Sequence, residues 1–470
     1  MKAKKSNFSE WYTEVIQESD LADYTAVSGC IVFKPYSFAI WEKLVATVDK
    51  RFKEIGIKNV YFPCLIPKRF LMKEVKHFEG FAPEVAWVTK SGNTDMEEPL
   101  AIRPTSEALM YDSYAKWIRS WRDLPLRLNQ WVNVVRWEFK HPTPFLRTRE
   151  FLFNEGHTAF ATQKESLAEE KQIIDIYQEV LEEYMAVPGI VGRKTDKEKF
   201  AGAVFSVSVE HLMPDKKGIQ GPAFHHDGQN FSKMFNIQFL DKNEHKELAW
   251  QNTFAISTRE IGTMIATHGD DKGLVIPPKI APTQVIIIPI FDKKSKKAVL
   301  AAAGKIKEQL KDFAVDIDDR DTYSPGRKFN EWELKGVPLR LEIGPRDIKN
   351  KEAVLVRRDT SEKKSVKQSN ISKETQKLLD DIQKNLFEKA QKFLAENIHE
   401  ANNLDAFKKI LEREKGMIRA GWCGSRRCED SIKDETGAKI TNLPYGLNTQ
   451  GKCVNCGKAA RHIAHFAKSY

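Results

Sequence analysis

Two strand-like segments joined by a loop with two prolines constrain the fold of this 470-residue chain more than any other feature. The first segment covers Trp131–Phe139, and the second begins near Arg147. Pro142 and Pro144 interrupt the stretch between them, and a proline cannot donate a hydrogen bond to a strand ladder. The pattern predicts an antiparallel hairpin.

The predicted hairpin is rich in charged and aromatic side chains. Side chains two positions apart on a strand share a face. Two groups are therefore expected to point together: Arg136 with Glu138, and Arg149 with Phe151 and Phe153. Fixed guanidinium groups suit a polyphosphate, an exposed ring suits a flat base, and nearby glutamates suit an ammonium group. A solvated, salt-bridged hairpin is the alternative, and this segment alone leaves both interpretations open.

Length and charge narrow the class of protein. A chain of this length is expected to form two to four domains with a sizeable core. It has no long apolar run and no signal-peptide pattern, so we expect a cytoplasmic protein without a membrane segment. Lysine and arginine exceed aspartate and glutamate by 75 to 65, a formal net charge of +10. This excess permits nucleic-acid binding without proving it, because lysine-rich surfaces are common.

Six cysteines fall into two kinds. Cys30 and Cys64 lie far apart and are expected to be buried thiols. The other four form two close pairs near the C-terminus: Cys423 with Cys428, and Cys453 with Cys456. Two such pairs in a chain without a secretory signal predict a structural zinc site with four thiolate ligands. Two reduced pairs or a disulfide are the alternatives.

The N-terminal third contains a predicted helix and a candidate polar loop. Phe38–Ile55 has the apolar spacing of a helix, and the short apolar strand Asn59–Ile66, which contains Pro63, follows it. Together they are a candidate dimerisation element. In the polar cluster Arg103–Glu107, Thr105 or Ser106 is expected to cap a helix over Glu107–Ile118.

A second candidate segment lies after residue 200. Within Ile219–Phe231, His225 and His226 are adjacent and should point to opposite faces of an extended chain, one toward a pocket and one toward the core. Spacing offers no third ligand, which argues against a metal at these histidines. Arg259 falls in the first turn of a predicted helix, where backbone N–H groups favour an anion.

Proline-rich residues 277–282 mark the predicted domain boundary. The boundaries we predict are 1–280, 281–400 and 401–470. Strands alternate with helices in the second range, as in an α/β layer domain. The fold class expected overall is mixed α/β (α+β), with the cysteines in the third range.

With these motifs in order, the chain resembles class II prolyl-tRNA synthetases of the archaeal and eukaryotic type over essentially its whole length. The matching segments are Phe62–Pro63 for the first class II motif, Arg136–Phe151 for the second, Phe254–Arg259 for the third, Arg103–Glu107 for the loop that holds the substrate amine, Tyr323–Gly326 and Arg340–Asp347 for the anticodon-binding domain, and the four cysteines with Tyr470 for the C-terminal domain. The resemblance implies an antiparallel catalytic sheet flanked by helices, two smaller domains, and a homodimer.

The resemblance also implies roles for individual residues. Arg136 and Arg259 would be the catalytic arginines that contact ATP phosphates. The implied ATP-binding set is Arg136, Glu138, Arg147, Thr148, Phe151, Gln220, Ser257 and Arg259, with Gln220 near Mg²⁺. The implied amino-acid-binding set is Thr105, Glu107, Arg136, Phe153, Glu155, His157, Ala223 and His225. Glu342 and Arg346 would contact the tRNA anticodon, and zinc would bind the four C-terminal cysteines. The implied reaction is ATP-dependent activation of proline, followed by its transfer to tRNA.

The segments that depart from the family pattern cluster around the amino-acid pocket. They are Phe153–Asn154 for Trp-Gln, Pro222–Phe224 within Gly-Gly-Thr-Ser-His-His, and Phe254–Ser257 within Trp-Gly-Leu-Thr-Thr-Arg. Phe224 and Ala255 add bulk that would fill the space of the proline ring. A paralogue charging tRNA with another small amino acid, such as alanine, is therefore a second hypothesis. Activation for an acceptor other than tRNA is a third, which the apparent anticodon domain argues against.

Overall fold

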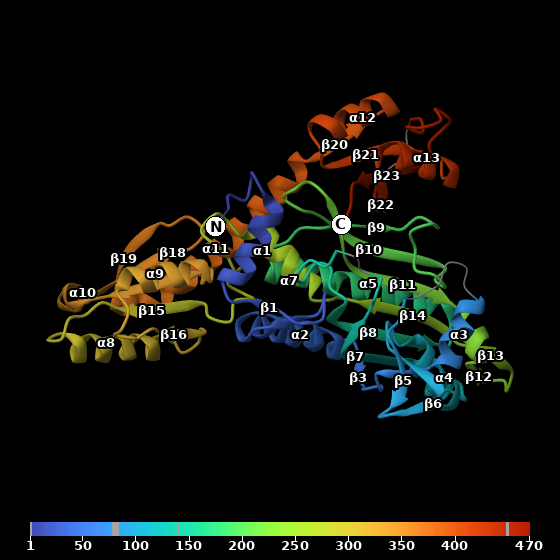
Figure 1. Cartoon of the computed structure of the whole chain (residues 1–470), viewed down its shortest axis with the longest axis horizontal. Helices are drawn as coiled ribbons and strands as arrows, with labels where there is room; N and C mark the ends of the chain where they lie inside the picture. Colours follow the sequence, from blue (N-terminus) through green and yellow to red (C-terminus); the bar gives the residue numbers. More distant parts are fainter. Residues whose placement is uncertain (1, 78–83, 139–140, 448–450) are drawn as a thin grey trace.

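The protein is described by a computed structural model that covers residues 2–77, 84–138, 141–447 and 451–470. In these ranges the largest sheet has eleven strands and runs through the middle of the molecule (Figure 1). Its order is β20 (Ile398–Ala401), β21 (Met417–Trp422), β23 (His462–Ala467), β22 (Lys439–Pro444), β9 (Ile190–Arg193), β10 (Phe205–Leu212), β11 (Gly218–Gly228), β14 (Trp250–Ala255), β8 (Glu150–Phe160), β7 (Leu126–Val135) and β3 (Lys58–Asn59). All neighbours are antiparallel except β3 with β7 and β20 with β21.

Long helices cover one face of the central sheet. They are α2 (Pro35–Glu54), α5 (Gln163–Glu179) and α7 (Arg259–His268), with α1 (Phe8–Glu18) beside them. Their apolar sides form one core with the inward side chains of β10, β11 and β14. Phe254 lies directly over Gly156 of β8, where any Cβ atom would stand 2.0 Å from its ring. A larger residue at position 156 would displace the ring from this core.

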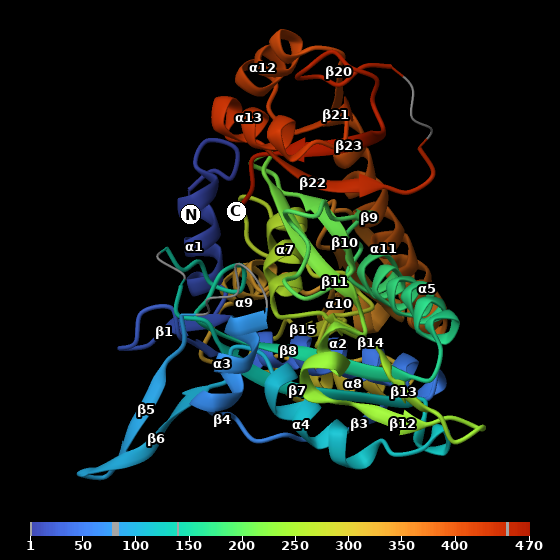
Figure 2. The same ribbon diagram turned by 90° about the vertical axis from the view of Figure 1, so that its right-hand side faces the viewer.

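Smaller elements cover the other face. Here α4 (Glu107–Trp117) and α6 (Asn230–Phe235) pack with the end of β7 in a second core. A three-stranded sheet, β4 (Leu65–Pro67), β6 (Thr94–Ile102) and β5 (Trp87–Ser91), projects from this side, and Figure 2 shows its hairpin extending away from the body. Helix α3 (Lys68–His77) and the pair β12 (Gln238–Leu240) and β13 (Lys246–Leu248) lie at the same side.

The predicted hairpin exists, but its strands are placed differently. Strand β7 ends at Val135 and β8 begins at Glu150, so Arg136, Glu138 and Arg147 lie in the connection and not on the strands. The Arg136 N–H still donates to the carbonyl of Arg149 at 2.7 Å, which holds the base of the loop closed. Phe139, the predicted end of the first strand, lies outside the described residues.

The predicted strand Asn59–Ile66 is wrong as a single element. It is two short strands, β3 and β4, with an irregular segment around Pro63 between them. Side chains satisfy the backbone there: Phe62 N–H donates to Gln130 Oε1 at 3.1 Å, and Arg103 Nη1 donates to the Phe62 carbonyl at 2.8 Å. These partners come from distant parts of the chain, so local sequence pattern does not reveal them.

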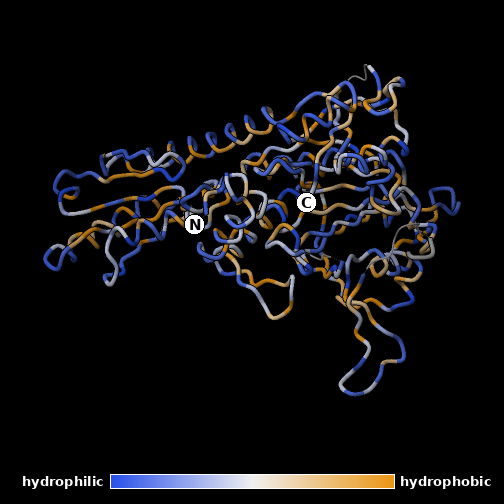
Figure 3. Tube along the Cα trace, turned by 45° about the horizontal axis from the view of Figure 1, so that its top comes forward, coloured by the Kyte–Doolittle hydropathy of each residue, from blue (hydrophilic) through white to orange (hydrophobic). Residues whose placement is uncertain are grey.

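Residues 285–396 form the predicted α/β layer. Its sheet order is β16 (Val315–Ile317), β15 (Val285–Pro289), β17 (Leu339–Ile343), β18 (Glu352–Arg357) and β19 (Lys363–Lys367). Helices α8 (Lys296–Gln309), α9 (Pro325–Leu334) and α10 (Pro345–Asn350) connect the strands. The long helix α11 (Ile371–Glu396) alternates hydrophilic and hydrophobic segments turn by turn (Figure 3) and buries its apolar side against this sheet.

The C-terminal segment continues the central sheet. After α12 (Leu404–Arg413) and α13 (Arg426–Thr436), strand β22 pairs with β9 through Leu443 with Arg193 and Pro444 with Gly192. A Cβ atom at Gly192 would stand 2.5 Å from the Leu443 carbonyl oxygen, so only glycine allows this close approach. Through this pairing, the C-terminal strands continue the sheet that contains β9, β10 and β11. None of the helices in the described ranges has the length and apolar character needed to span a bilayer.

Candidate active site

A cavity of about 490 Å³ opens on the face of the central sheet opposite α2. It lies between the start of α4, the loop after β7, and strands β8, β11 and β14. Nine residues that the sequence predicted line it: Thr105, Glu107, Arg136, Glu138, Phe153, Glu155, His157, Gln220 and His225. The structure thus brings together side chains separated by up to 120 positions in the sequence.

Six predicted residues are not part of the cavity lining, although several of them contact residues that are. Phe151 lies under Arg136, with the guanidinium carbon 5.4 Å from the ring centre. Arg259 Nη1 donates to the Gln220 carbonyl at 3.0 Å, and Ala223 is the cross-strand partner of Ala255, which does line the cavity. The other three are Arg147, which is exposed, Thr148, which is buried, and Ser257, which forms a bridge with Phe153.

Glu155 is a buried carboxylate in the cavity that is held by several hydrogen bonds. Its carboxylate accepts hydrogen bonds from Thr105 Oγ1 at 2.7 Å, Ser106 N–H at 2.7 Å and Gln130 Nε2 at 3.0 Å. His157 Nε2 lies 3.6 Å from the same carboxylate. Burial favours the neutral acid, but the contacts with His157, Ser106 and Thr105 outweigh it and lower the pKa of Glu155 to about 2. Glu155 is therefore ionised at neutral pH.

The pKa of Glu107 is shifted in the opposite direction to that of Glu155. Burial and the negative charge of Glu155 raise the pKa of Glu107 above its ordinary value. The Thr105 hydroxyl is in hydrogen-bond contact with both carboxylates, yet it has a single proton to donate. The raised pKa of Glu107 favours an arrangement in which Thr105 donates its proton to the ionised Glu155. Thr105 or Ser106 was predicted to cap this helix; Ser106 occupies the N-cap position, but its side chain makes no capping hydrogen bond.

The two adjacent histidines divide as predicted. His225 lines the cavity, and its Nδ1 lies 2.7 Å from Ser206 Oγ. Burial, with smaller effects from Lys194 and Arg136, lowers the pKa of His225 to about 3, so its ring is neutral. His226 points to the core and pairs with Asn252 Oδ1 at 2.8 Å.

Arg136 is fixed in position but keeps its charge available. Its Nε donates to the Pro104 carbonyl at 3.1 Å, and its guanidinium stacks on Phe151. In the parts of the chain that the structure describes, no carboxylate forms an ion pair with Arg136 or Arg259, and the two terminal nitrogens of Arg136 have no hydrogen-bond partner. A pair of oriented, uncompensated arginines is a site for a polyanion. This geometry argues against the alternative of a merely salt-bridged hairpin.

Sequence reasoning missed several residues of the site. Gln130 faces Glu155 across β7 and β8 and donates a hydrogen bond to its carboxylate. The segment Glu198–Phe200 also lines the cavity, and the ring centre of Phe200 lies 4.9 Å from that of His225. Alternation along a strand indicates which residues share a face, but the register between strands, which places Gln130 opposite Glu155, is a tertiary property.

Two substitutions that suggested a reshaped pocket lie outside it. Phe224 was expected to fill ring space, but it is fully buried on the opposite face of the sheet, where it stacks on Phe254. Asn154 also faces away and accepts a hydrogen bond from Tyr177 at 3.1 Å. Because side chains alternate between the faces of a strand, residues next to a pocket residue in sequence point away from the pocket. Among these departures, Phe153 and Ala255 do line the cavity.

The predicted anticodon residues lie in the α/β layer. Glu342 on β17 pairs with Arg340 at 2.9 Å, and Lys363 lies 3.8 Å away. Arg346 is exposed on α10. Glu342 is buried whereas Arg346 is exposed, and within the described residues no hydrogen bond or ion pair joins the two side chains.

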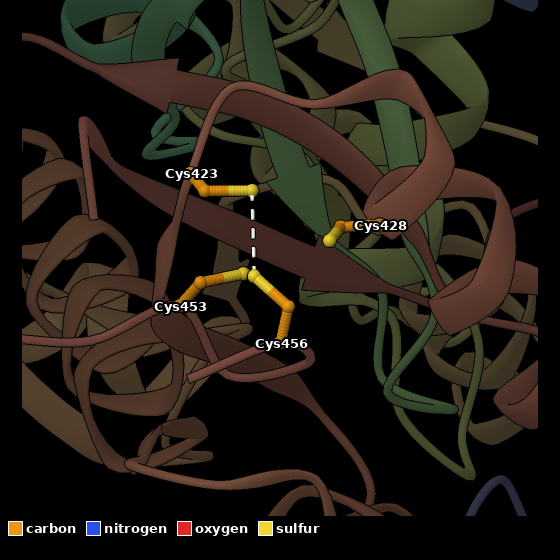
Figure 4. Close-up of side chains that lie close together, drawn as sticks. All are labelled: Cys423, Cys428, Cys453 and Cys456. Carbon is orange, nitrogen blue, oxygen red and sulfur yellow. Dashed lines mark hydrogen bonds between the residues drawn. The ribbon is translucent and has the colours of Figure 1, made fainter. Parts of the chain in front are cut away.

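The four C-terminal cysteines converge on one point (Figure 4). Their sulfur atoms all lie within 4.8 Å of one another, and the Cys423 and Cys456 sulfurs are 3.8 Å apart. Thiolates at about 2.3 Å from a tetrahedral zinc ion would be separated by about 3.8 Å, so the donor set fits that metal. The other two cysteines are less buried than predicted, since Cys64 is exposed and Cys30 is half-buried.

The comparisons with known proteins agree with the fold. Residues 87–268 match the tRNA synthetase class II core domain (G, H, P, S and T), residues 284–378 the anticodon binding domain, and residues 404–470 the prolyl-tRNA synthetase C-terminal domain. A proline–tRNA ligase of Natranaerobius thermophilus is 49% identical over 97% of this chain and 94% of its own length. Proline–tRNA ligase 2 of Clostridioides difficile is 47% identical over 99% and 97%. The bifunctional glutamate/proline–tRNA ligase of Cricetulus griseus is 46% identical over 99% of this chain and 33% of its own length.

An antiparallel sheet that carries a polyanion-binding hairpin beside an anticodon-binding domain defines a class II aminoacyl-tRNA synthetase, an enzyme that uses ATP and Mg²⁺. Within that class, the near full-length similarity shows that this chain belongs to the prolyl-tRNA synthetase family.

The two glutamates of the cavity should respond oppositely to neutralisation. Glu155→Gln places an amide N–H₂ against existing donors, so we expect a loss of about 1.5–3 kcal/mol of stability. Glu107→Gln removes a carboxylate whose ionisation is unfavourable, so its melting temperature should rise at neutral pH. Thermal unfolding of both variants, with Glu42→Gln on the exposed side of α2 as a control, measures the two shifts.

The pH dependence has a defined sign. The folded pKa of Glu155 is about 2, against an ordinary value of 4.5, so its contribution to stability is present above pH 4.5 and is lost as the pH falls toward 2. The difference in melting temperature between wild type and Glu155→Gln should shrink over that range. A difference that stays constant down to pH 3 would contradict the assigned protonation state.

Proposed function

We propose that the enzyme activates proline with ATP to form prolyl-adenylate and then transfers the prolyl group to tRNA(Pro). The observation that carries the proposal is the pair of arginines, Arg136 and Arg259, held beside the cavity without a carboxylate partner in the described ranges. The names of the relatives support proline as the substrate. Phe224 and Asn154 are buried and point away from the cavity, so they give little reason to expect a different amino acid.

The polar groups of the cavity suggest how the amino acid is bound. The Glu155 carboxylate, with Thr105 and Glu107 beside it, provides a negative site for the substrate ammonium. Phe153, Phe200 and the neutral His225 offer apolar and aromatic surface for a pyrrolidine ring. Arg136, which lines the same cavity, is proposed to meet the substrate carboxylate and the α-phosphate together. This arrangement orients the carboxylate for in-line attack.

The chemistry requires positioning and charge neutralisation. The substrate carboxylate attacks the α-phosphorus, the bond to the bridging oxygen breaks, and pyrophosphate leaves. Arg136 and Arg259 would stabilise the charge that develops on the phosphoryl oxygens. Glu138 and Arg147 would hold the nucleotide, and Phe151 would stack on the adenine with Thr148 near it. Ser257, beside the ribose, completes the proposed ATP-binding set. Gln220 would lie near the Mg²⁺ ion, which when bound would supply further charge neutralisation. No side chain has to form a covalent bond with the substrate.

Two further roles concern the tRNA and the place of action. Glu342 and Arg346 are proposed to contact anticodon bases, because the matched anticodon-binding domain contains both. Charging of tRNA for protein synthesis implies action in the cytoplasm.

Pyrophosphate exchange with each of the twenty amino acids tests the function directly. We expect exchange that depends on proline and a much lower rate with alanine, because the cavity lining keeps most of the predicted amino-acid-binding groups. Charging of purified tRNA(Pro) should follow. Faster exchange with alanine than with proline would replace the proposed substrate, and absence of exchange with every amino acid would exclude the activity.

Arg136→Ala should lower proline-dependent exchange by about 100-fold or more, since removing one preorganised electrostatic donor costs about 10²–10³ in rate. Its fold should persist, because the guanidinium makes one hydrogen bond, to the Pro104 carbonyl, and one ring contact. Exposed Arg122, which stacks on Trp121 away from the cavity, provides the matched control as Arg122→Ala. Exchange near the wild-type rate in Arg136→Ala would refute the role.

We propose that Cys423, Cys428, Cys453 and Cys456 bind one structural zinc ion, which the convergence of their sulfurs supports. Metal analysis should find about one zinc per chain. Cys453→Ser should lose the metal and lower the melting temperature, whereas Cys64→Ser should keep it. Full zinc content in Cys453→Ser would contradict the site.

We further propose a homodimer formed through the β4–β6 region. Large apolar side chains with high exposure lie in or next to these strands: Tyr61 at 72%, Leu65 at 38% and Trp87 at 42%. Such a patch is typical of an interface. Sedimentation should give about twice the chain mass of 53.9 kDa. Tyr61→Asp should shift the protein toward the monomer, and a wild-type monomer at micromolar concentration would exclude the proposal.

A further inference from the structure

One wall of the active-site cavity comes from a turn that no motif marks. Residues 195–200 leave β9, turn at 196–198, and place Glu198, Lys199 and Phe200 in the cavity lining. Phe200 N–H donates to Ser206 Oγ at 3.0 Å, and the same hydroxyl contacts His225. The position of this turn therefore determines the position of an aromatic ring in the proposed amino-acid pocket.

The C-terminal segment holds the turn through side-chain contacts. Thr195 Oγ1 donates to Glu429 Oε1 at 2.7 Å, Lys197 forms an ion pair with Asp430, and Lys439 Nζ lies 2.9 Å from Glu198 Oε2. Glu429 and Asp430 belong to α13, and Lys439 belongs to β22. Three residues of the turn, Thr195, Lys197 and Glu198, are thus bonded to residues more than 230 positions later in the chain.

Thr195 connects these contacts to the cavity. Its side chain is buried, and its hydroxyl accepts a hydrogen bond from Glu198 N–H at 3.3 Å while it donates to Glu429. Its carbonyl accepts from Lys199 N–H at 2.9 Å. Next to it, buried Lys194 donates to the Thr441 carbonyl at 2.8 Å and pairs with Glu210 at 2.5 Å. The turn is therefore anchored to the C-terminal segment at residues 194–198, and its Phe200 end is held by Ser206.

We propose that Thr195, Glu429 and Lys439 are positioning residues that let the C-terminal segment set the shape of the amino-acid end of the cavity. The inference rests on the proposed function for its kinetic consequence. None of the three lines the cavity, so none is assigned contact with substrate. Glu429 follows Cys428 directly in α13, so the start of the helix that carries one cysteine of the cluster also holds the turn.

The physical reason is an entropic cost of binding. If the turn is already ordered in the free enzyme, binding of the amino acid loses no further conformational entropy there. If the turn is released, binding has to order it, and the affinity falls. Loss of the Thr195 contacts should therefore raise KM for proline and leave kcat nearly unchanged, because the residues that act on the phosphates lie elsewhere. ATP affinity should also remain close to the wild-type value.

Thr195→Val tests this by removing the hydroxyl with little change of shape. We expect KM for proline in pyrophosphate exchange to rise about 10-fold, the fold-change for one lost buried hydrogen bond of about 1.4 kcal/mol. Thr195→Ser, which keeps the hydroxyl, should restore KM. Lys408→Gln, which breaks the exposed pair with Glu435 in the same C-terminal segment, should leave KM unchanged.

Hydrogen exchange on the substrate-free enzyme gives an independent measurement. Amides of residues 196–204 should exchange faster in Thr195→Val and in Glu429→Ala than in wild type, while those of β7 and β8 should not change. The double variant should be no worse than either single variant, because both lose the same contact. Unchanged exchange in 196–204, or faster exchange spread over the whole chain with a fall in kcat, would overturn the inference. A wild type that activates no proline would refute the proposed function, and the exchange comparison, made without substrate, would still decide this one.

Discussion

The hydrogen-bonded carboxylate of Glu155 is the interaction on which the site depends. It sits on a central strand, and its donors come from the loop before α4 and from the neighbouring strand β7. A buried charge is tolerable only when several donors surround it. By collecting them, Glu155 fixes the position of Thr105 and of the start of α4, and Thr105 in turn contacts Glu107. The amino-acid end of the cavity is therefore built around one ionised side chain.

The positive charges of Arg136 and Arg259, in contrast, are not paired with carboxylates in the described residues. Arg136 is oriented by a backbone carbonyl and by the ring of Phe151, and Arg259 by two carbonyls, those of Leu146 and Gln220. Backbone carbonyls orient a guanidinium group without neutralising it, whereas a carboxylate would compete with a phosphate for the same charge. Such an arrangement costs stability and provides preorganised electrostatics for a developing negative charge. Burial of Glu107 beside the charge of Glu155, which raises the pKa of Glu107, is a further cost of this arrangement.

The sequence predicted the hairpin, the α/β layer, the cysteine cluster and the division of roles between His225 and His226, because each depends on local spacing or alternation. It misplaced the ends of the hairpin strands, because Arg136 and Arg149 pair outside regular strand geometry. It also assigned Phe224 to the pocket, although alternation along β11 with His225 in the cavity places Phe224 in the core. The contribution of residues 198–200 was not predictable, since a turn with no motif reaches the cavity only through contacts with a distant C-terminal segment.

By itself, the sequence determined the chemical inventory of this protein: which arginines, glutamates and cysteines are present, and which of them share a face or a short loop. Only the tertiary structure decided which of these groups meet, which are neutralised and which remain charged. Register between strands, the closure of the turn at 195–200 by Glu429 and Lys439, and the continuation of the central sheet into β22 are contacts between distant parts of the chain. Local periodicity contains no information about them, because the same pattern on one strand is compatible with several partners on the next.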